Sequence, residues 1–203
     1  MKFFFLLLLV QFAATSLFAL ELEGEPVQGG LMFGTVDPGT RVMLDETEVA
    51  VSRDGQFVIG FGRDEDGTRV LKLVAADGSE TRRDLAVSSR EYQIERVDGL
   101  PQNTVTPPPE AAERIRAEGA MVANARARKH EHPHYINGFD WPAFGRISGV
   151  YGSQRILNGI PGRPHYGLDV AAPTGTLVKA PADGVITLTH PDMYFSGGTI
   201  ILD

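Results

Sequence analysis

Two side chains in the last third of the sequence have the types and the spacing of a metal site. His165 and Asp169 lie four positions apart, and both imidazole and carboxylate bind zinc at roughly 2.0–2.2 Å. Pro164 and Gly167 argue against a helix at this point. In an extended strand, at roughly 3.3 Å per residue, the two Cα atoms would be about 13 Å apart, a long reach for sharing one ion. We therefore expect a bend near His165, with that residue in a loop and Asp169 on a strand.

The spacing leaves a second interpretation of this pair open. An H-x-x-x-D pattern arises by chance in many proteins, and a loop His165 that is hydrogen-bonded to Asp169 would need no metal. Gly167 suits the metal interpretation, because it presents no side chain that would block an ion between the two ligands.

A second group of histidines lies earlier in the chain. His130, His132 and His134 alternate beside Glu131, and such a set of side chains could hold a transition metal. Pro133 and the polar surroundings of the segment favour a solvated linker instead.

The residues around His165 resemble the lysostaphin-like (M23) family of zinc metalloendopeptidases, which act on bacterial cell walls. Its members carry a G-R-I-S/T-S/G-x-[FY]-G opening, a G-x-D-[IVF]-A-A-P-x-G-T stretch and a K/R-A-P-A-D/A-G-x-V strand. This chain has G-R-I-S-G-V-Y-G at 145–152, G-L-D-V-A-A-P-T-G-T at 167–176 and K-A-P-A-D-G-V-I at 179–186. The match spans about residues 139–203 and implies the N-terminal part of an M23 peptidase domain with an antiparallel β-sheet core.

The resemblance implies that His165 and Asp169 are two ligands of a Zn²⁺ cofactor. In the family, the third ligand and the catalytic histidine come from an H-x-H motif that follows a G-G-x-x-I strand. Residues 197–203 match that strand, so the motif would lie beyond Asp203. His190, which we expect in a turn, matches neither missing position. The resemblance therefore implies no catalytic residue within this chain.

These implications lead to a specific functional expectation. A catalytic zinc needs three protein ligands and an open position for the attacking water. We expect residues 1–203 to be inactive, as a chain cut within its catalytic domain, and the complete parent chain to hydrolyse peptide bonds of peptidoglycan. The alternative is a non-catalytic M23-like protein that binds wall peptides or activates another hydrolase. The two differ in the presence of the H-x-H motif.

The elements before the peptidase region form a separate predicted domain, residues 22–100. Short β-like runs, such as 56–61 and 69–74, alternate there with turn signals such as Asp54-Gly55 and Asp77-Gly78. This pattern predicts a small immunoglobulin-like β-sandwich. It contains no histidine, and we expect a spacer or binding module through which a regulatory protein could act.

Residues 101–138 are predicted to connect the two domains. Three prolines at 107–109 favour an extended linker, and 110–129 should form one helix with acidic residues at its start and basic residues at its end. Its thin apolar face consists of Ala112, Ile115, Val122 and Ala125.

Composition and the N-terminus indicate export. Residues 1–19 have the charged start, apolar stretch and final small residue of a secretory signal peptide, with an uncleaved anchor as the alternative. Because Lys2 is the single charge in this segment, its removal changes the net charge from −7 to −8.

An acidic protein has no electrostatic attraction to nucleic acid. We expect a periplasmic or cell-envelope protein of a bacterium, without a stable membrane span after cleavage, whose partners are peptidoglycan peptides.

Overall fold

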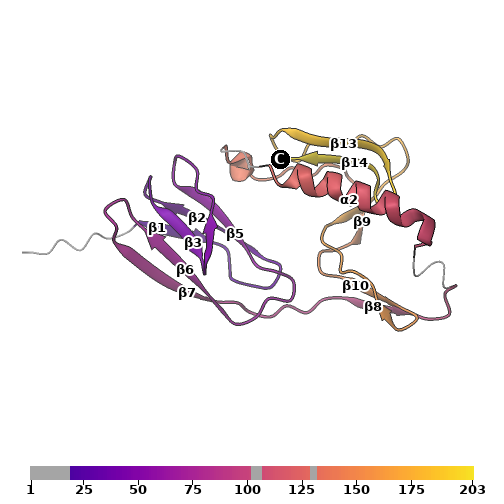
Figure 1. The fold of residues 1–203 in the computed structure, drawn as a ribbon, viewed down its shortest axis with the longest axis horizontal. Helices are drawn as coiled ribbons and strands as arrows, with labels where there is room; N and C mark the ends of the chain where they lie inside the picture. Colours follow the sequence, from indigo (N-terminus) through magenta and orange to yellow (C-terminus); the bar gives the residue numbers. More distant parts are fainter. Residues whose placement is uncertain (1–18, 102–106, 129–131) are drawn as a thin grey trace, which may run out of the picture.

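The computed structural model of the protein describes residues 19–101, 107–128 and 132–203. Most of its elements are β-strands, arranged in several antiparallel sheets beside one short α-helix, so the predicted mainly β fold class is confirmed (Figure 1). The predicted signal peptide at 1–19 lies outside the described residues except for Ala19. Among the helices of the described ranges, none has the length and apolar character needed to cross a membrane.

The first half of the chain is a β-sandwich of two antiparallel sheets. One sheet has the order β1–β2–β5, formed by Leu20–Glu23, Leu31–Val36 and Gln56–Gly60. The other has the order β4–β3–β6–β7, formed by Thr47–Val49, Arg41–Leu44, Thr68–Val74 and Glu80–Ala86. This is an immunoglobulin-type strand order in which β4 pairs with β3 and so belongs to the sheet of β3, β6 and β7. The sequence pattern predicted a sandwich of this type.

The predicted turn signals at Gly55 and Gly78 lie between these strands, with φ values of 82° and 84°. Gly39 and Gly67, which each follow an aspartate within two residues, lie in two further turns with φ values of 86° and 80°. Glycine adopts this left-handed region at little cost, so each signal can reverse the chain within a few residues.

The sandwich core is built by both sheets. Strand β2 alternates exposed and buried residues, as expected for a strand with one face toward a core. Phe57 of β5 packs over Gly34 of β2, where an added Cβ would lie 2.1 Å from the aromatic ring. From the opposite sheet, Val42 and Leu71 have no exposed surface. The buried cluster consists of Met32, Val36, Val42, Phe57, Ile59, Phe61, Leu71, Leu73 and Leu85.

Truncation of Leu71 tests this core. We expect Leu71→Ala to lower the free energy of unfolding by about 2–5 kcal/mol, because it removes a buried side chain and leaves a cavity. Leu31→Ala is the matched control, since Leu31 is 55% exposed and its truncation should cost less than about 1 kcal/mol. Urea denaturation followed by circular dichroism measures both, and equal losses would contradict the assignment of the core.

One strand after the sandwich joins the two halves of the chain. β8, Ile94–Val97, lies within the range 22–100 predicted for the sandwich, yet it pairs in parallel with β10, Gln154–Leu157. Glu95 and Arg155 form an ion pair of 2.8 Å along this pairing. The last strand that pairs within the sandwich is therefore β7, which ends at Ala86.

The second half consists of short antiparallel pairs. β9 (Arg146–Gly149) pairs with β12 (Asp169–Ala171), and β10 pairs with β11 (Ile160–Pro161). β13 (Ile186–Met193) pairs with β14 (Gly197–Leu202). The strand expected at 197–203 is thus β14, the last strand of the hairpin with β13 (Figure 1). On β14, Ile200 remains 68% exposed.

The predicted connecting helix is α2, Ala112–Arg126, which follows a 3-10 turn, η1, at Pro109–Ala111. Residues 102–106 and 129–131 lie outside the described residues, and so does the predicted end of the helix at Lys129. The helix lies along the β13–β14 hairpin (Figure 1). Its half-buried and buried positions are Ile115, Glu118, Val122 and Ala125, whereas Ala112 is exposed.

Glu118 fixes the helix to the hairpin, which explains why a charged residue lies on the packed side. Its carboxylate accepts hydrogen bonds from Nε of Arg114 at 2.7 Å and from the backbone N–H of Tyr194 at 2.8 Å. Arg114 also forms an ion pair of 3.1 Å with Asp192. The hydrogen bond from Arg114, followed by that from Tyr194, lowers the pKa of Glu118 below its ordinary value.

This lowered pKa predicts a pH-dependent helix contact. Since the folded-state pKa of Glu118 lies below its ordinary value of 4.5, the carboxylate stabilises the docked helix above that pH. The stabilisation is lost as the pH falls through the folded-state pKa. Hydrogen exchange at the Tyr194 amide should therefore accelerate, relative to its intrinsic rate, as the pH falls below 4.5 and through the folded-state pKa. In Glu118→Gln this pH dependence should disappear, and its persistence would show that another group controls the contact.

Candidate metal centre

The chain bends between His165 and Asp169, as the spacing predicted. His165 lies in a loop, Gly167 is at a bend, and Asp169 is the first residue of β12. Nε2 of His165 lies 3.3 Å from Oδ1 of Asp169. The bend therefore brings together two side chains that an extended strand would hold apart.

Backbone hydrogen bonds fix both ends of this bend. The N–H of His165 donates to the carbonyl of Ser153 at 2.8 Å, and the N–H of Gly152 donates to the carbonyl of His165 at 2.7 Å. At the other end, Asp169 pairs with Gly149 across β9 and β12, where the register shifts by a bulge. Such irregularities redirect side chains, and here the bulge coincides with the carboxylate.

Glycine at position 149 leaves room for the Asp169 carboxylate. A Cβ at Gly149 would lie 2.4 Å from Oδ2 and 3.1 Å from Cγ of Asp169. At Gly167, an added Cβ would lie 3.9 Å from Nε2 of His165, so this glycine does border the imidazole. Gly149 of the motif at 145–152 and Gly167 of the motif at 167–176 thus flank the two candidate ligands.

The environment of His165 fits a metal ligand. Its side chain is 34% exposed, yet the Nε2 atom itself is shielded from solvent and has no hydrogen-bond partner among the described residues. Two ligands at about 2.1 Å from a tetrahedral zinc would be about 3.4 Å apart, close to the observed separation. The same separation also suits a direct ion pair between a protonated His165 and Asp169.

The described residues bring two candidate ligands together in this bend. Across 19–101, 107–128 and 132–203, no group of three or more His, Cys, Asp or Glu side chains is close enough to hold a metal.

His190 lies in β13, opposite Thr199, so the expectation that it lies in a turn is wrong. The register shift between His190 and Met193 explains how Pro191 is accommodated in a strand.

His165 and Asp169 open onto a pocket of about 890 Å³. Its walls come from β9, β10, the loop 163–165 and Phe195 at the β13–β14 turn. Gln93 and Glu95 complete the wall from the β8 side. Sequence reasoning missed these two residues, because they lie far from the motif and only the parallel pairing of β8 with β10 brings them to the site.

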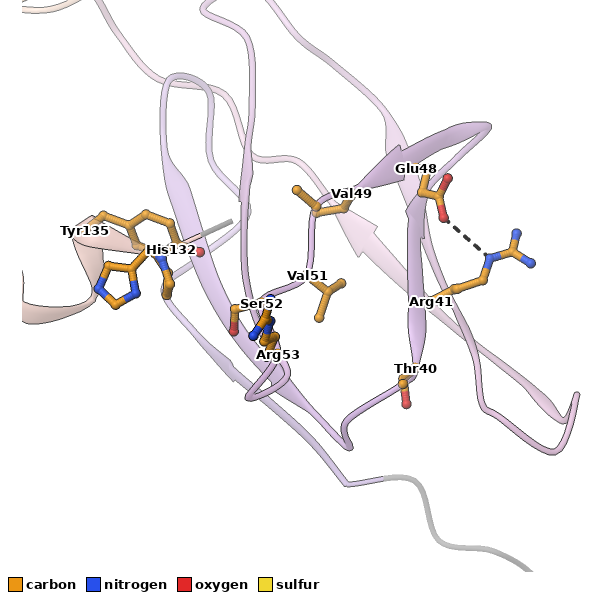
Figure 2. A pocket seen from close by; sticks show the side chains of 12 residues that line it. Thr40, Arg41, Glu48, Val49, Val51, Ser52, Arg53, His132 and Tyr135 are labelled. Carbon is orange, nitrogen blue, oxygen red and sulfur yellow. Dashed lines mark ion pairs between the residues drawn. The ribbon is translucent and has the colours of Figure 1, made fainter. Parts of the chain in front are cut away.

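The other histidine group lies at a different pocket. His132 and Tyr135 border a pocket of about 740 Å³ opposite Val49 and Val51 of the sandwich (Figure 2). The rings of His132 and His134 are 4.7 Å apart, edge to face. His130 lies outside the described residues, so the predicted three-histidine cluster stays a prediction. This pocket and the one at His165 have no lining residue in common.

No protein-family model and no curated protein matches the sequence. The resemblance to the M23 family is therefore carried by the motifs at 145–152, 167–176 and 179–186 alone.

Substitution of Gly149 tests the packing at the site. In Gly149→Ala, the added Cβ should force the Asp169 carboxylate away from His165 and lower the free energy of unfolding by about 1 kcal/mol. The imidazole resonances of His165 and the carboxyl resonance of Asp169 should shift. Gly119→Ala is the matched control, because a Cβ at Gly119 meets no atom within 4 Å. Unchanged resonances in Gly149→Ala would contradict the close contact.

Proposed function

We propose that this protein is an exported zinc metalloendopeptidase that hydrolyses peptide bonds of bacterial peptidoglycan. In this proposal His165 and Asp169 are two of the zinc ligands, and the protein acts in the periplasm or cell envelope. The observation that carries it is the Nε2 atom of His165, which is shielded from solvent, makes no hydrogen bond among the described residues and lies 3.3 Å from Oδ1 of Asp169. The motif residues on both sides of this pair add support.

The described residues account for part of the required chemistry. When bound, the zinc would polarise the scissile carbonyl and lower the pKa of its water. His165 would contribute a neutral imidazole nitrogen, and Asp169 a carboxylate that offsets the charge of the ion. Two backbone hydrogen bonds fix the loop position of His165, from which its ring reaches Asp169. Such preorganisation reduces the cost of ordering the side chains on binding.

The resemblance assigns the remaining functions to the H-x-H motif expected beyond Asp203. One histidine would be the third ligand and the other would assist proton transfer or stabilise the developing oxyanion. In the M23 family this motif follows the strand that β14 would represent here.

A non-catalytic role in wall binding, or as an activator of another hydrolase, is the second candidate. It is compatible with the described residues, among which no group of three or more His, Cys, Asp or Glu side chains could hold a metal. In this case the pocket of about 890 Å³ would bind wall peptides without cleaving them. The sandwich would act in either case as a spacer or as the surface for a regulatory protein.

Metal binding and activity can be tested separately. With residues 1–203, we expect weak zinc binding that His165→Ala or Asp169→Ala abolishes, measured by isothermal titration calorimetry, and no cleavage of purified peptidoglycan. In a chain extended through an H-x-H motif, both substitutions should lower hydrolysis more than 100-fold. This exceeds the 10–100-fold loss typical of changing a residue that only hydrogen-bonds to a metal ligand.

His190→Ala serves as the control for both measurements, because His190 lies on β13 and does not line the pocket at His165. If wild-type 1–203 bound zinc with an affinity that His165→Ala left unchanged, the metal would bind elsewhere and the proposal would be wrong. An extended natural chain without an H-x-H motif would favour the non-catalytic candidate.

A further inference from the structure

A single arginine of the sandwich reaches the loop that holds His165. Arg63 follows β5, and its side chain is only 10% exposed. Its Nε donates a hydrogen bond of 2.8 Å to the carbonyl of Gly152. Arg63 also pairs with Asp64, which keeps its charge compensated at this partly buried position. An arginine rarely becomes this buried unless its donors are satisfied.

Tyr92 completes this contact from the segment after the sandwich. The guanidinium carbon of Arg63 lies 4.5 Å from the centre of the Tyr92 ring, within cation–π range. The same ring covers Gly152, where an added Cβ would lie 2.0 Å from Cδ1 and from Cε1. Gly152 also has a φ of 84°, which disfavours any other residue. The last glycine of the motif at 145–152 is therefore clamped between an arginine and a tyrosine.

A second contact holds the neighbouring residue. Tyr151 packs against Gly29 of the sandwich, where an added Cβ would lie 2.5 Å from the ring. The N–H of Gly29 donates to the carbonyl of Gly62 at 3.1 Å. This hydrogen bond joins the β1–β2 and β5–β6 loops, which together form the surface that Tyr151 and Gly152 contact. Burial raises the pKa of Tyr151, and nearby Tyr92 and Tyr166 raise it further. Tyr151 is thus held as a neutral, packed ring.

The clamped loop provides both backbone partners of His165. Gly152 donates to the His165 carbonyl, and the Ser153 carbonyl accepts from the His165 N–H. A displacement of Gly152 would therefore move the backbone of His165 together with its ring. We propose that the β-sandwich positions His165 through Arg63, which makes Arg63 a positioning residue of the candidate metal centre. The part of this proposal that concerns zinc rests on the proposed function, whereas the mechanical coupling does not.

The contact gives the sandwich a more specific role than that of a spacer. A spacer would need only a flexible connection, but here two loops of the sandwich and Tyr92 enclose Tyr151 and Gly152. The charge-assisted hydrogen bond of Arg63 ends on a fully enclosed residue, since Gly152 is buried. A partner that pulled on the sandwich would act on His165 through this contact.

Arg63→Ala in the full chain tests the coupling by hydrogen exchange. We expect exchange at the amides of Gly152 and His165 to accelerate at least about tenfold, the lower range for losing a hydrogen bond to a charged group. Core amides such as Leu73 should keep their protection, which separates a local effect from general unfolding. Arg63→Lys should restore part of the protection, because an ammonium can also donate to the Gly152 carbonyl.

Arg82→Ala is the matched control, since it removes the same charge from the sandwich at a side chain that is 67% exposed. It should change neither amide. Unchanged exchange at Gly152 and His165 in Arg63→Ala would overturn the coupling.

Zinc titration of the same variants separates this proposal from the proposed function. The imidazole resonances of His165 should shift in Arg63→Ala without metal, and zinc affinity should fall about tenfold relative to wild type and Arg82→Ala. If wild type binds no zinc while Arg63→Ala still loosens the two amides, the coupling stands and the metal function fails. If Arg63→Ala leaves the amides and the resonances unchanged, the coupling fails whatever the zinc result.

Discussion

The candidate metal centre depends on one short stretch of chain, residues 146–153. Through β9 this stretch pairs with Asp169, and through the loop after β9 it exchanges two backbone hydrogen bonds with His165. The same backbone segment therefore holds both candidate ligands in place, although they lie on different sides of a bend. Because both are attached to this segment, their polar atoms lie 3.3 Å apart. Any change that moves this stretch changes the position of both ligands at once.

The two halves of the chain differ in what stabilises them. The sandwich has a continuous buried cluster around Phe57 and Leu71, and such a core is closely packed and rigid. In the region that carries the site, Met193 is the one buried apolar residue among the described residues after 138, and Leu177 and Phe144 are 84% and 79% exposed. Contacts such as that of Arg63 with Gly152 therefore connect a lightly packed site to a well-packed support.

The motif glycines are informative because of the groups that approach them. Gly149 accommodates the carboxylate of Asp169, and Gly152 accommodates the ring of Tyr92. Neither residue has chemistry of its own, yet each defines where a functional group can lie. This explains how a motif that contains few reactive side chains can specify a site, and why its glycines cannot be exchanged for alanine without moving a neighbour.

The sequence by itself determined the sandwich strands and their glycine turns, because these features follow from local periodicity and from the backbone preferences of glycine. It determined the bend between His165 and Asp169 only in part: proline and glycine excluded a helix there, and the bend itself was inferred from the assumption that both side chains bind one ion. Tertiary structure alone decided that β8 pairs with β10, that Arg63 reaches Gly152 and that Glu118 packs against the hairpin. It also put His190 in a strand, where a bulge accommodates the following proline. These contacts join residues tens of positions apart, and their partners depend on which surfaces the folded halves bring together, information that no local pattern carries.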